Sequence, residues 1–205
     1  MVVLLNADAV RPRPLRSVVG ALAPMLLSRA SWDRQFARGD WDRLRDGDER
    51  AHHAAIVACL ARPGRPPRVL DVGCGDGALA ELLAGLPCAR YHGIDHSREA
   101  LRRARPGGPP GATHEVVDVG AFTTAERYDA IVFSELLYYL RRPADVLRRY
   151  AGFLADDGVL IVSMFDYFRA RRAWRAIDRR FVTLEAHHLT GGHGQRWDVR
   201  ALAPW

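Results

Sequence analysis

Residues 68–80, which read RVLDVGCGDGALA, constrain the fold more than any other stretch of the chain. Residues 69–72 form a short, mostly apolar run that is typical of a buried strand. Three glycines follow at alternate positions, and leucines at 79, 82 and 83 then set a helical period. Such glycines let the chain turn tightly and leave bare backbone N–H groups for a ligand at a helix start. The stretch therefore predicts a cofactor loop in an α/β fold.

The glycine pattern alone leaves the cofactor open. Gly73, Gly75 and Ala78 satisfy a loose dinucleotide fingerprint, and Asp95 lies 20 residues after Gly75, where a ribose-binding acid is expected. Asp71 distinguishes the alternatives, because its carboxylate would face a pyrophosphate with like charge but suits the ammonium group of a methionine moiety.

The run DVGCGDG, from Asp71 to Gly77, resembles motif I of the class I methyltransferases that depend on S-adenosylmethionine (SAM). The resemblance implies that SAM lies against the loop, and we expect Asp71, Gly73, Cys74 and Gly75 to bind it. An acid at the end of the strand predicted over residues 91–95 can accept both ribose hydroxyls, which assigns Asp95 to the ribose.

Three further residues are assigned to the adenosyl group. We expect His96 to stack beside the adenine. A third strand is predicted over residues 114–117 and ends in Asp118 and Val119. An acid here resembles the family position that binds the adenine amino group, with the following N–H on a ring nitrogen.

The segment SELLYYL, from Ser134 to Leu140, follows a fourth predicted strand over residues 128–134. In doubly wound sheets, chemistry gathers at the carboxyl ends of strands near the switch point. Glu135 is therefore the first candidate for a base or an amine-orienting carboxylate, and Tyr138 is the second, with Ser134 on the cofactor side. The segment looks like its counterpart in nodulation-protein-S type N-methyltransferases and related amino-sugar and natural-product enzymes.

Residues 1–62 are expected to form an N-terminal helical cap, and residues 63–205 the SAM-binding core of a single domain. Trp32 and Phe36 share a helical face, and Trp41 follows the break at Gly39. Two interpretations of these aromatic residues are equally compatible with the sequence. They form a small core under the cap, or they belong to a lid that places Trp32 and Trp41 near the cofactor. Ser31 or Asp33 is a possible helix N-cap.

The C-terminal part predicts the rest of the sheet. A helix is expected over residues 144–155, and a fifth strand over residues 159–164 after a turn in which Gly158 supplies a positive φ. Residues 181–189 and 196–202 flank a glycine-rich loop and predict a hairpin. A closing antiparallel pair separates the methyltransferase sheet from the nicotinamide-binding one. The resemblance to the class I methyltransferases then implies a Rossmann-like, doubly wound sheet of seven strands in the order 3-2-1-4-5-7-6.

Composition narrows the setting. The formal net charge is +6, but the basic residues are all arginine, which suggests a GC-rich coding bias and gives only weak support for a nucleic-acid partner. The three cysteines fit no metal spacing and favour a reduced, cytoplasmic setting, and His187, His188 and His193 define no metal site. No metal and no membrane segment are predicted. The neighbouring His52 and His53 are expected to be structural or solvated.

Together these features predict a SAM-dependent methyltransferase that acts on an amine or hydroxyl of a small molecule, such as a sugar or another secondary metabolite, as a monomer or homodimer. Two alternatives stay open from the sequence: a nicotinamide-dependent oxidoreductase, and a SAM-binding protein without catalysis.

Overall fold

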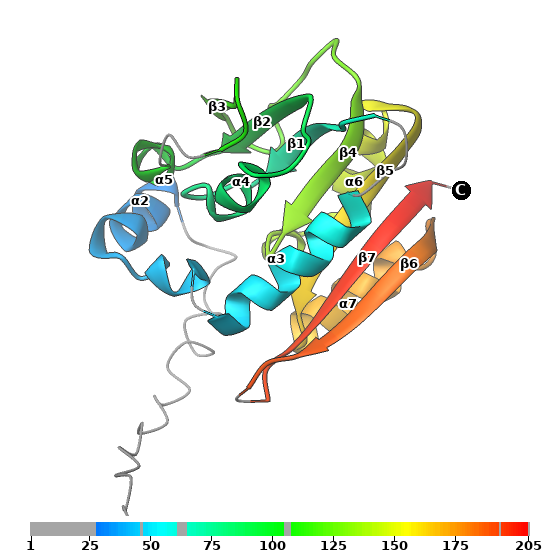
Figure 1. Ribbon diagram of the computed structural model, residues 1–205. Coiled ribbons are helices and arrows are strands. Elements are labelled where there is room, and N and C mark those ends of the chain that lie inside the picture. Colours follow the sequence, from blue (N-terminus) through cyan, green and yellow to red (C-terminus); the bar gives the residue numbers. More distant parts are fainter. Residues whose placement is uncertain (1–27, 46, 61–64, 105–107, 193, 205) are drawn as a thin grey trace, which may run out of the picture.

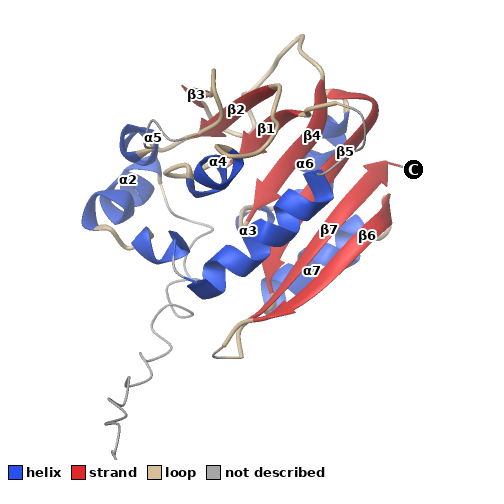
Figure 2. Cartoon of the chain, viewed as in Figure 1, coloured by secondary structure: helices blue, strands red, loops and turns tan. Residues whose placement is uncertain are grey.

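A seven-stranded sheet with the order β3-β2-β1-β4-β5-β7-β6 forms the centre of the protein, as predicted. The computed structural model describes residues 28–45, 47–60, 65–104, 108–192 and 194–204. Helices cover both faces of the sheet (Figure 1, Figure 2). The elements, with η for a short 3-10 helix, are α2 (Arg29–Arg38), η2 (Asp42–Arg45), α3 (Gly47–Leu60), β1 (Arg68–Val72), α4 (Ala78–Leu83), β2 (Arg90–Asp95), α5 (Arg98–Arg103), β3 (Thr113–Val116), β4 (Tyr128–Ser134), η3 (Leu137–Tyr139), α6 (Pro143–Ala151), β5 (Leu154–Phe165), α7 (Phe168–Ile177), β6 (Phe181–Thr190) and β7 (Arg196–Pro204).

The two faces of the sheet carry separate apolar clusters. Neighbouring strand residues point to opposite faces, so Val132 and Ile161 pack with α3 and α4, whereas Ile131 and Leu160 pack with α6 and α7. Because β1 and β4 are covered on both faces, their sequences are almost continuously apolar. The carboxyl ends of β1, β2 and β4 are thereby fixed along one edge of the sheet.

The last two strands close the sheet in an antiparallel arrangement. β7 pairs with the second half of β5, from Leu160 to Phe165, and with β6 over nearly its whole length. This hairpin is the feature that the sequence analysis used to separate a methyltransferase sheet from a nicotinamide-binding one, and the structure contains it.

The connection from α6 into β5 differs from the prediction. The helix ends at Ala151 rather than near residue 155, and β5 begins already at Leu154 with a register shift between Tyr128 and Ala130 of β4. Gly158 does not have the expected positive φ. It is needed for space instead, because a Cβ there would lie 2.9 Å from the Tyr128 carbonyl oxygen.

The part of the predicted cap that the structure describes divides in two. α3 lies on the sheet, where Ile56 and Leu60 belong to its core, while α2 packs against α5 at the edge (Figure 1). Residues 1–27 lie outside the described part. Among the described helices, none combines the length and the apolar character needed to cross a membrane.

Candidate functional site

The glycine loop after β1 is built from backbone conformations that only glycine adopts easily. Gly73, Gly75 and Gly77 have φ values of 75°, 55° and 83°. The N–H groups of Gly73 and Cys74 both donate to the Ile94 carbonyl, at 2.8 and 3.1 Å, which ties the loop to the end of β2. The loop then passes directly into α4, as predicted.

Cys74 and Gly93 fit together beneath this loop. The Cys74 side chain is buried, and a Cβ on Gly93 would lie 2.8 Å from its Sγ. Burial raises the pKa of the Cys74 thiol well above its ordinary value, so the thiol stays protonated. Cys74 is therefore a packing residue of the loop, and Gly93 leaves it room.

Asp71 is a buried acid inside the sheet. Its Oδ2 accepts a hydrogen bond of 2.6 Å from the Tyr91 hydroxyl. Its Oδ1 is also buried and has no hydrogen-bond partner among the described residues. Burial raises the pKa of Asp71 to about 7, even though the Tyr91 bond lowers it. A buried carboxylate oxygen with spare acceptor capacity suits a cationic group such as an ammonium.

Asp95 holds the loop and the next helix together. Its Oδ2 accepts from the Gly75 N–H at 3.0 Å, and its Oδ1 accepts from the Ser97 N–H at 2.7 Å. Burial raises the pKa of Asp95, and these two bonds act in the opposite direction. Asp95 thus lies where β2 meets the glycine loop, as expected of a ribose-binding acid.

Asp118 and Val119 follow β3 at the same edge. Asp118 is exposed, and its Oδ1 accepts from the Gly120 N–H at 2.7 Å. The Val119 carbonyl accepts from the Tyr150 hydroxyl at 2.9 Å, which anchors this turn to α6. Since Val117 donates to the Asp95 carbonyl, the turn continues the row of strand ends that contains Asp95.

An aromatic cluster covers the loop from the cap side. Trp32 and Trp41 stack with ring centroids 5.5 Å apart, and Trp32 also meets the rings of His96 at 6.1 Å and Tyr139 at 5.2 Å. The Phe36 ring lies 3.4 Å from the position that a Cβ on Gly75 would take. Phe36 is buried and therefore fits the core interpretation. Trp32 contacts residues of three other segments, as the lid interpretation expects.

Polar contacts attach α2 to α5. Asp33 Oδ1 accepts from the Ser97 hydroxyl at 2.6 Å and from the Glu99 N–H at 3.2 Å, and Arg103 donates to the Phe36 carbonyl. Neither Ser31 nor Asp33 caps α2, whose N-cap position is Ser28. Asp33 was considered a helix cap from sequence, but it bonds instead to the start of α5, a contact that no local pattern indicates.

Glu135 lies at the end of β4 in a strained conformation. Its φ is 54°, the one positive value found among the described residues other than glycine. Such a conformation costs on the order of 1 kcal/mol and is typical of functional sites. The Glu135 N–H donates to the Ser163 carbonyl at 2.9 Å, which holds this backbone against β5.

The Glu135 carboxylate is held from two sides. The Tyr138 hydroxyl donates to its Oε2 at 2.6 Å, and the Ser163 hydroxyl lies 3.5 Å from its Oε1. Burial, and then the nearby Glu135 charge, raise the pKa of Tyr138 well above its ordinary value, so this hydroxyl remains a donor. The structure brings the two predicted catalytic residues into direct contact.

Glu135 is also next to the cofactor loop. The side chain of Leu136 lies 3.1 Å from the position that a Cβ on Gly73 would take. Ser134, the last residue of β4, pairs with Ser163 of β5. The carboxyl ends of β1 and β4 therefore bring the glycine loop and Glu135 together at the switch point of the sheet.

Two further residues contact this region, and one of them was missed from sequence. Ser163 was not singled out, although it is a lone polar residue within the apolar run of β5, and that was the available signal. His52 was expected to be structural or solvated; with His53 it is buried, and its Nδ1 lies 3.1 Å from the Ser163 hydroxyl.

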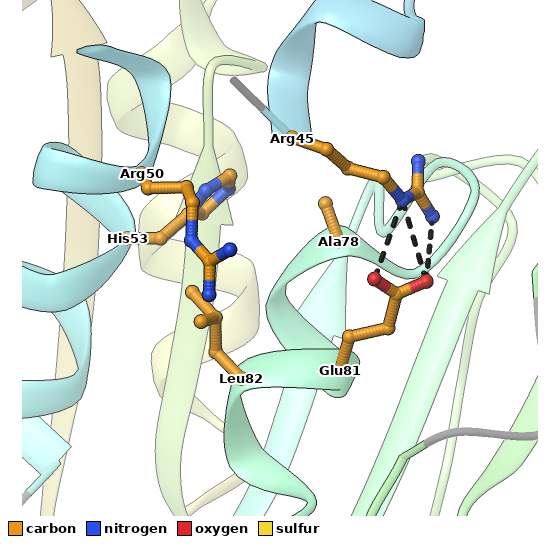
Figure 3. Close-up of a pocket in the computed structure, with 6 residues that line it drawn as sticks. All are labelled: Arg45, Arg50, His53, Ala78, Glu81 and Leu82. Atoms are coloured by element: carbon orange, nitrogen blue, oxygen red, sulfur yellow. Dashed lines mark hydrogen bonds and ion pairs between the residues drawn. The ribbon is translucent and has the colours of Figure 1, made fainter. Parts of the chain in front are cut away.

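A cavity of about 240 Å³ lies between α3 and α4, lined by Arg45, Arg50, His53, Ala78, Glu81 and Leu82. Figure 3 shows the Arg45 guanidinium against the Glu81 carboxylate, with Arg50 and His53 reaching in from α3. Arg45 also pairs with Asp76 of the glycine loop at 2.5 Å. This cavity borders the loop, and its remaining cationic group is the exposed Arg50.

The residues present fit SAM. The glycines turn the backbone tightly at the strand end and carry no side chains toward a ligand, although their own N–H groups donate within the protein. Asp71 offers a buried oxygen for an ammonium group, and Asp95 stands at the strand end that a ribose requires. In this fit, Asp71, Asp95 and the glycine loop would hold the cofactor, with Trp32 and His96 beside it.

No metal was predicted, and among the described residues one group of possible ligands comes together. Cys59 of α3 and Glu185 and His187 of β6 place their ligand atoms within 4.8 Å of one another. Burial raises the pKa of Cys59 to about 11, and His187 Nε2 lies 2.8 Å from Glu185 Oε1. A metal would have to displace the thiol proton and that contact, so a protein without a metal stays our prediction.

Comparisons with known proteins show the family to which the chain belongs. A family model described as a methyltransferase domain matches residues 43–205. Nodulation protein S of Bradyrhizobium diazoefficiens is 33% identical over 135 residues, which cover 63% of this chain and 64% of that protein. Trans-aconitate 2-methyltransferase of Methylobacterium nodulans is 37% identical over 131 residues, which cover 62% of this chain and 50% of that protein. The matches thus span about half to two thirds of these relatives.

The solved structures show the same fold. The N-methyltransferase NodS of Bradyrhizobium japonicum, in complex with S-adenosylhomocysteine (SAH), superposes with a TM-score of 0.71 at 23% identity, covering 86% of this chain and 97% of that one. Magnesium protoporphyrin IX methyltransferase of Synechocystis, with bound SAM, gives a TM-score of 0.61 at 20% identity, covering 86% of this chain and 97% of that one.

Proposed function

Because the chain belongs to the class I SAM-dependent methyltransferase family, we propose that the protein transfers the methyl group of SAM to an amine or hydroxyl of a small molecule. The observation that carries this proposal is the position of Glu135, strained and doubly held beside the glycine loop. The proposed acceptor class is a sugar or another secondary metabolite, in line with the likeness to nodulation protein S.

The proposed chemistry needs little from the protein beyond geometry and proton removal. When bound, SAM supplies a methyl group on a positively charged sulfur. The protein must then orient the acceptor and receive its proton. In this proposal Glu135 takes or orients the acceptor proton, and Tyr138 orients Glu135 through the hydrogen bond of 2.6 Å. An amine must lose its ammonium proton before it can attack, which makes a carboxylate at this point useful for either acceptor.

The lid and the partners complete the proposal. We assign residues 1–62 as a cap on a single domain, with α2 as its lid element over the loop. The protein is proposed to act in the cytoplasm as a monomer or homodimer, without nucleic acid. The all-arginine set of basic residues does not by itself argue for an RNA or DNA substrate.

The first experiment is calorimetric titration of the full chain with SAH, with NADH in parallel. Binding of SAH alone at micromolar or tighter affinity is the expected result, and binding of NADH alone would revive the oxidoreductase alternative. SAM is then incubated with panels of amines and alcohols, and SAH formation is followed. Tight SAH binding without turnover on any panel member favours a SAM-binding protein without catalysis.

A further inference from the structure

The Glu135 carboxylate bridges the two layers of the protein. Tyr138, which reaches its Oε2, packs in the cluster under α6 and α7. Ser163, near its Oε1, follows Val159 and Ile161 at alternate positions of β5 and therefore faces the α3 side. Each layer of the protein thus contributes one hydroxyl that contacts one oxygen of the Glu135 carboxylate.

His52 extends this chain of contacts into α3. Its side chain is fully buried, and its Nδ1 lies 3.1 Å from the Ser163 hydroxyl oxygen. The ring is fixed by stacking on Trp197, with centroids 5.7 Å apart and planes 16° apart, and by the His53 ring at 4.1 Å. A buried imidazole in contact with two neighbouring rings presents its Nδ1 to Ser163 in a fixed direction.

Hydrogen counting sets the direction of these bonds. A serine hydroxyl has one hydrogen, and an ionised carboxylate only accepts. If Ser163 donates to Glu135 Oε1, its oxygen must accept from His52, whose hydrogen is then on Nδ1. With Tyr138 donating to Oε2, every donor in the network points toward the carboxylate, which favours the ionised form.

We propose, resting on the proposed function, that His52 and Ser163 are positioning residues that hold the Glu135 carboxylate ionised and oriented toward the acceptor. His52 does not reach the reacting atoms; it acts through Ser163. The same serine accepts from the Glu135 N–H through its carbonyl, so it fixes both the strained backbone and the side chain of Glu135.

Other titratable groups lie around His52, Ser163 and Glu135, but they do not orient the Glu135 carboxylate. Burial above all, and then His52 and the guanidinium groups of Arg45 and Arg50, lower the pKa of His53 well below its ordinary value. On the opposite side, burial raises the pKa of Tyr138 and Tyr167 well above the ordinary value, so both hydroxyls remain protonated. The other titratable groups there are Tyr139 and Arg169.

The test follows the Glu135 carboxyl directly and needs no acceptor. The full chain is labelled with ¹³C at glutamate carboxyl carbons, and the Glu135 signal is identified by its loss in Glu135→Gln. Its titration midpoint should rise by about 1 pH unit in Ser163→Ala, which removes the donor to Oε1, and in His52→Phe, which removes the hydrogen bond that directs the Ser163 hydroxyl toward Oε1. His52→Asn, whose amide N–H can stand where Nδ1–H stood, should restore most of the wild-type midpoint.

His53→Phe is the matched control, since it changes the neighbouring ring on the same helix but not the contact to Ser163. It should leave the midpoint unchanged. A midpoint in His52→Phe equal to that of the wild type overturns the proposal, even if Ser163→Ala shifts it. If His52→Phe does not fold, ¹⁵N-histidine spectra of the wild type decide: an Nδ1 of His52 without a hydrogen at neutral pH overturns the proposal.

SAH titration of each variant separates this inference from the proposed function. Unchanged SAH affinity shows that a variant keeps the cofactor side intact. Failure of the wild type to bind SAH would refute the proposed function but leave the carboxyl titration readable, whereas normal SAH binding with an unmoved midpoint would refute only the role of His52.

Discussion

The glycine loop and the Glu135 network lie at the same edge of the sheet, but they are assembled in different ways. The loop, Asp71 and Asp95 come from one strand–helix–strand unit. The Glu135 network joins α3, β4 and β5, and Ser163 and His52 are 111 residues apart in sequence. The residues that we propose for the cofactor, here the cofactor half, are therefore encoded locally. Those that we propose for the acceptor, the acceptor half, come together only once the sheet and α3 have packed.

The sharpest separation of the two halves is expected from Glu135→Gln. Loss of a group that accepts a proton should lower turnover by about 100-fold or more, while SAH affinity stays within about twofold. Turnover with an acceptor found by the panel screen and SAH calorimetry measure the two quantities. A large loss of SAH affinity with normal turnover at saturation would instead place Glu135 in the cofactor half.

Asp95→Ala should show the opposite pattern. Loss of charge-assisted hydrogen bonds should weaken SAH binding by about 10- to 100-fold, with the effect on turnover relieved at saturating SAM. Asp118→Ala is the matched comparison and should cost about 2- to 10-fold, because Asp118 is exposed. Equal effects of the two substitutions would contradict the assignment of Asp95 to the ribose.

The cofactor half should also respond to pH through Asp71. Burial raises the pKa of this acid to about 7, so an ammonium ligand requires loss of its proton. SAH affinity should therefore fall as the pH drops below 7, by at most about tenfold per pH unit. Calorimetry between pH 5.5 and 8 measures this, and the dependence should disappear in Asp71→Asn.

The raised pKa of Asp71 also determines whether its contribution to the free energy of unfolding increases or decreases with pH. The native state holds the Asp71 proton from the ordinary acid range up to a pH of about 7, whereas the unfolded state has released it. The contribution of Asp71 to the free energy of unfolding without ligand should thus decrease as pH rises through that window. Urea unfolding of wild type and Asp71→Asn at pH 5 and 8 tests it, since the variant lacks this term.

A smaller effect is expected in the cap. Trp32→Leu removes a ring that touches Trp41, His96 and Tyr139, and it should weaken SAH binding about threefold. Phe168→Leu, at an aromatic residue that is 60% exposed on α7, is the control and should change nothing. An unchanged affinity in Trp32→Leu would leave the cap as packing alone.

The smallest expected effect is that of metal removal. Dialysis against a chelator should leave SAH affinity and turnover unchanged, since the Cys59 thiol is held protonated by burial. Loss of activity that zinc restores in the wild type but not in Cys59→Ala would contradict this prediction and establish the cluster with Glu185 and His187 as a metal site.

The strands and the glycine loop could be predicted from the sequence because they leave local patterns, whereas the sheet order followed from the resemblance to class I methyltransferases. Strand periodicity, the glycines and the acid at each strand end are visible in a few residues. The end of α6 and the role of Gly158 were missed because they depend on how β5 pairs with β4, which local propensity does not specify. Ser163 was missed, and its contact with the buried His52 could not be foreseen, because that contact joins segments far apart in sequence.

The attachment of α2 to α5 bears on the end of each catalytic cycle. Asp33 and Arg103 hold this helix by polar contacts, and Phe36 is its one buried residue among those described. Polar contacts can be exchanged for water at little net cost, so parting of the two helices exposes only a small apolar area. With the cofactor under α2 as we propose, we expect the spent cofactor to leave through separation of α2 from α5, and product release to be sensitive to salt.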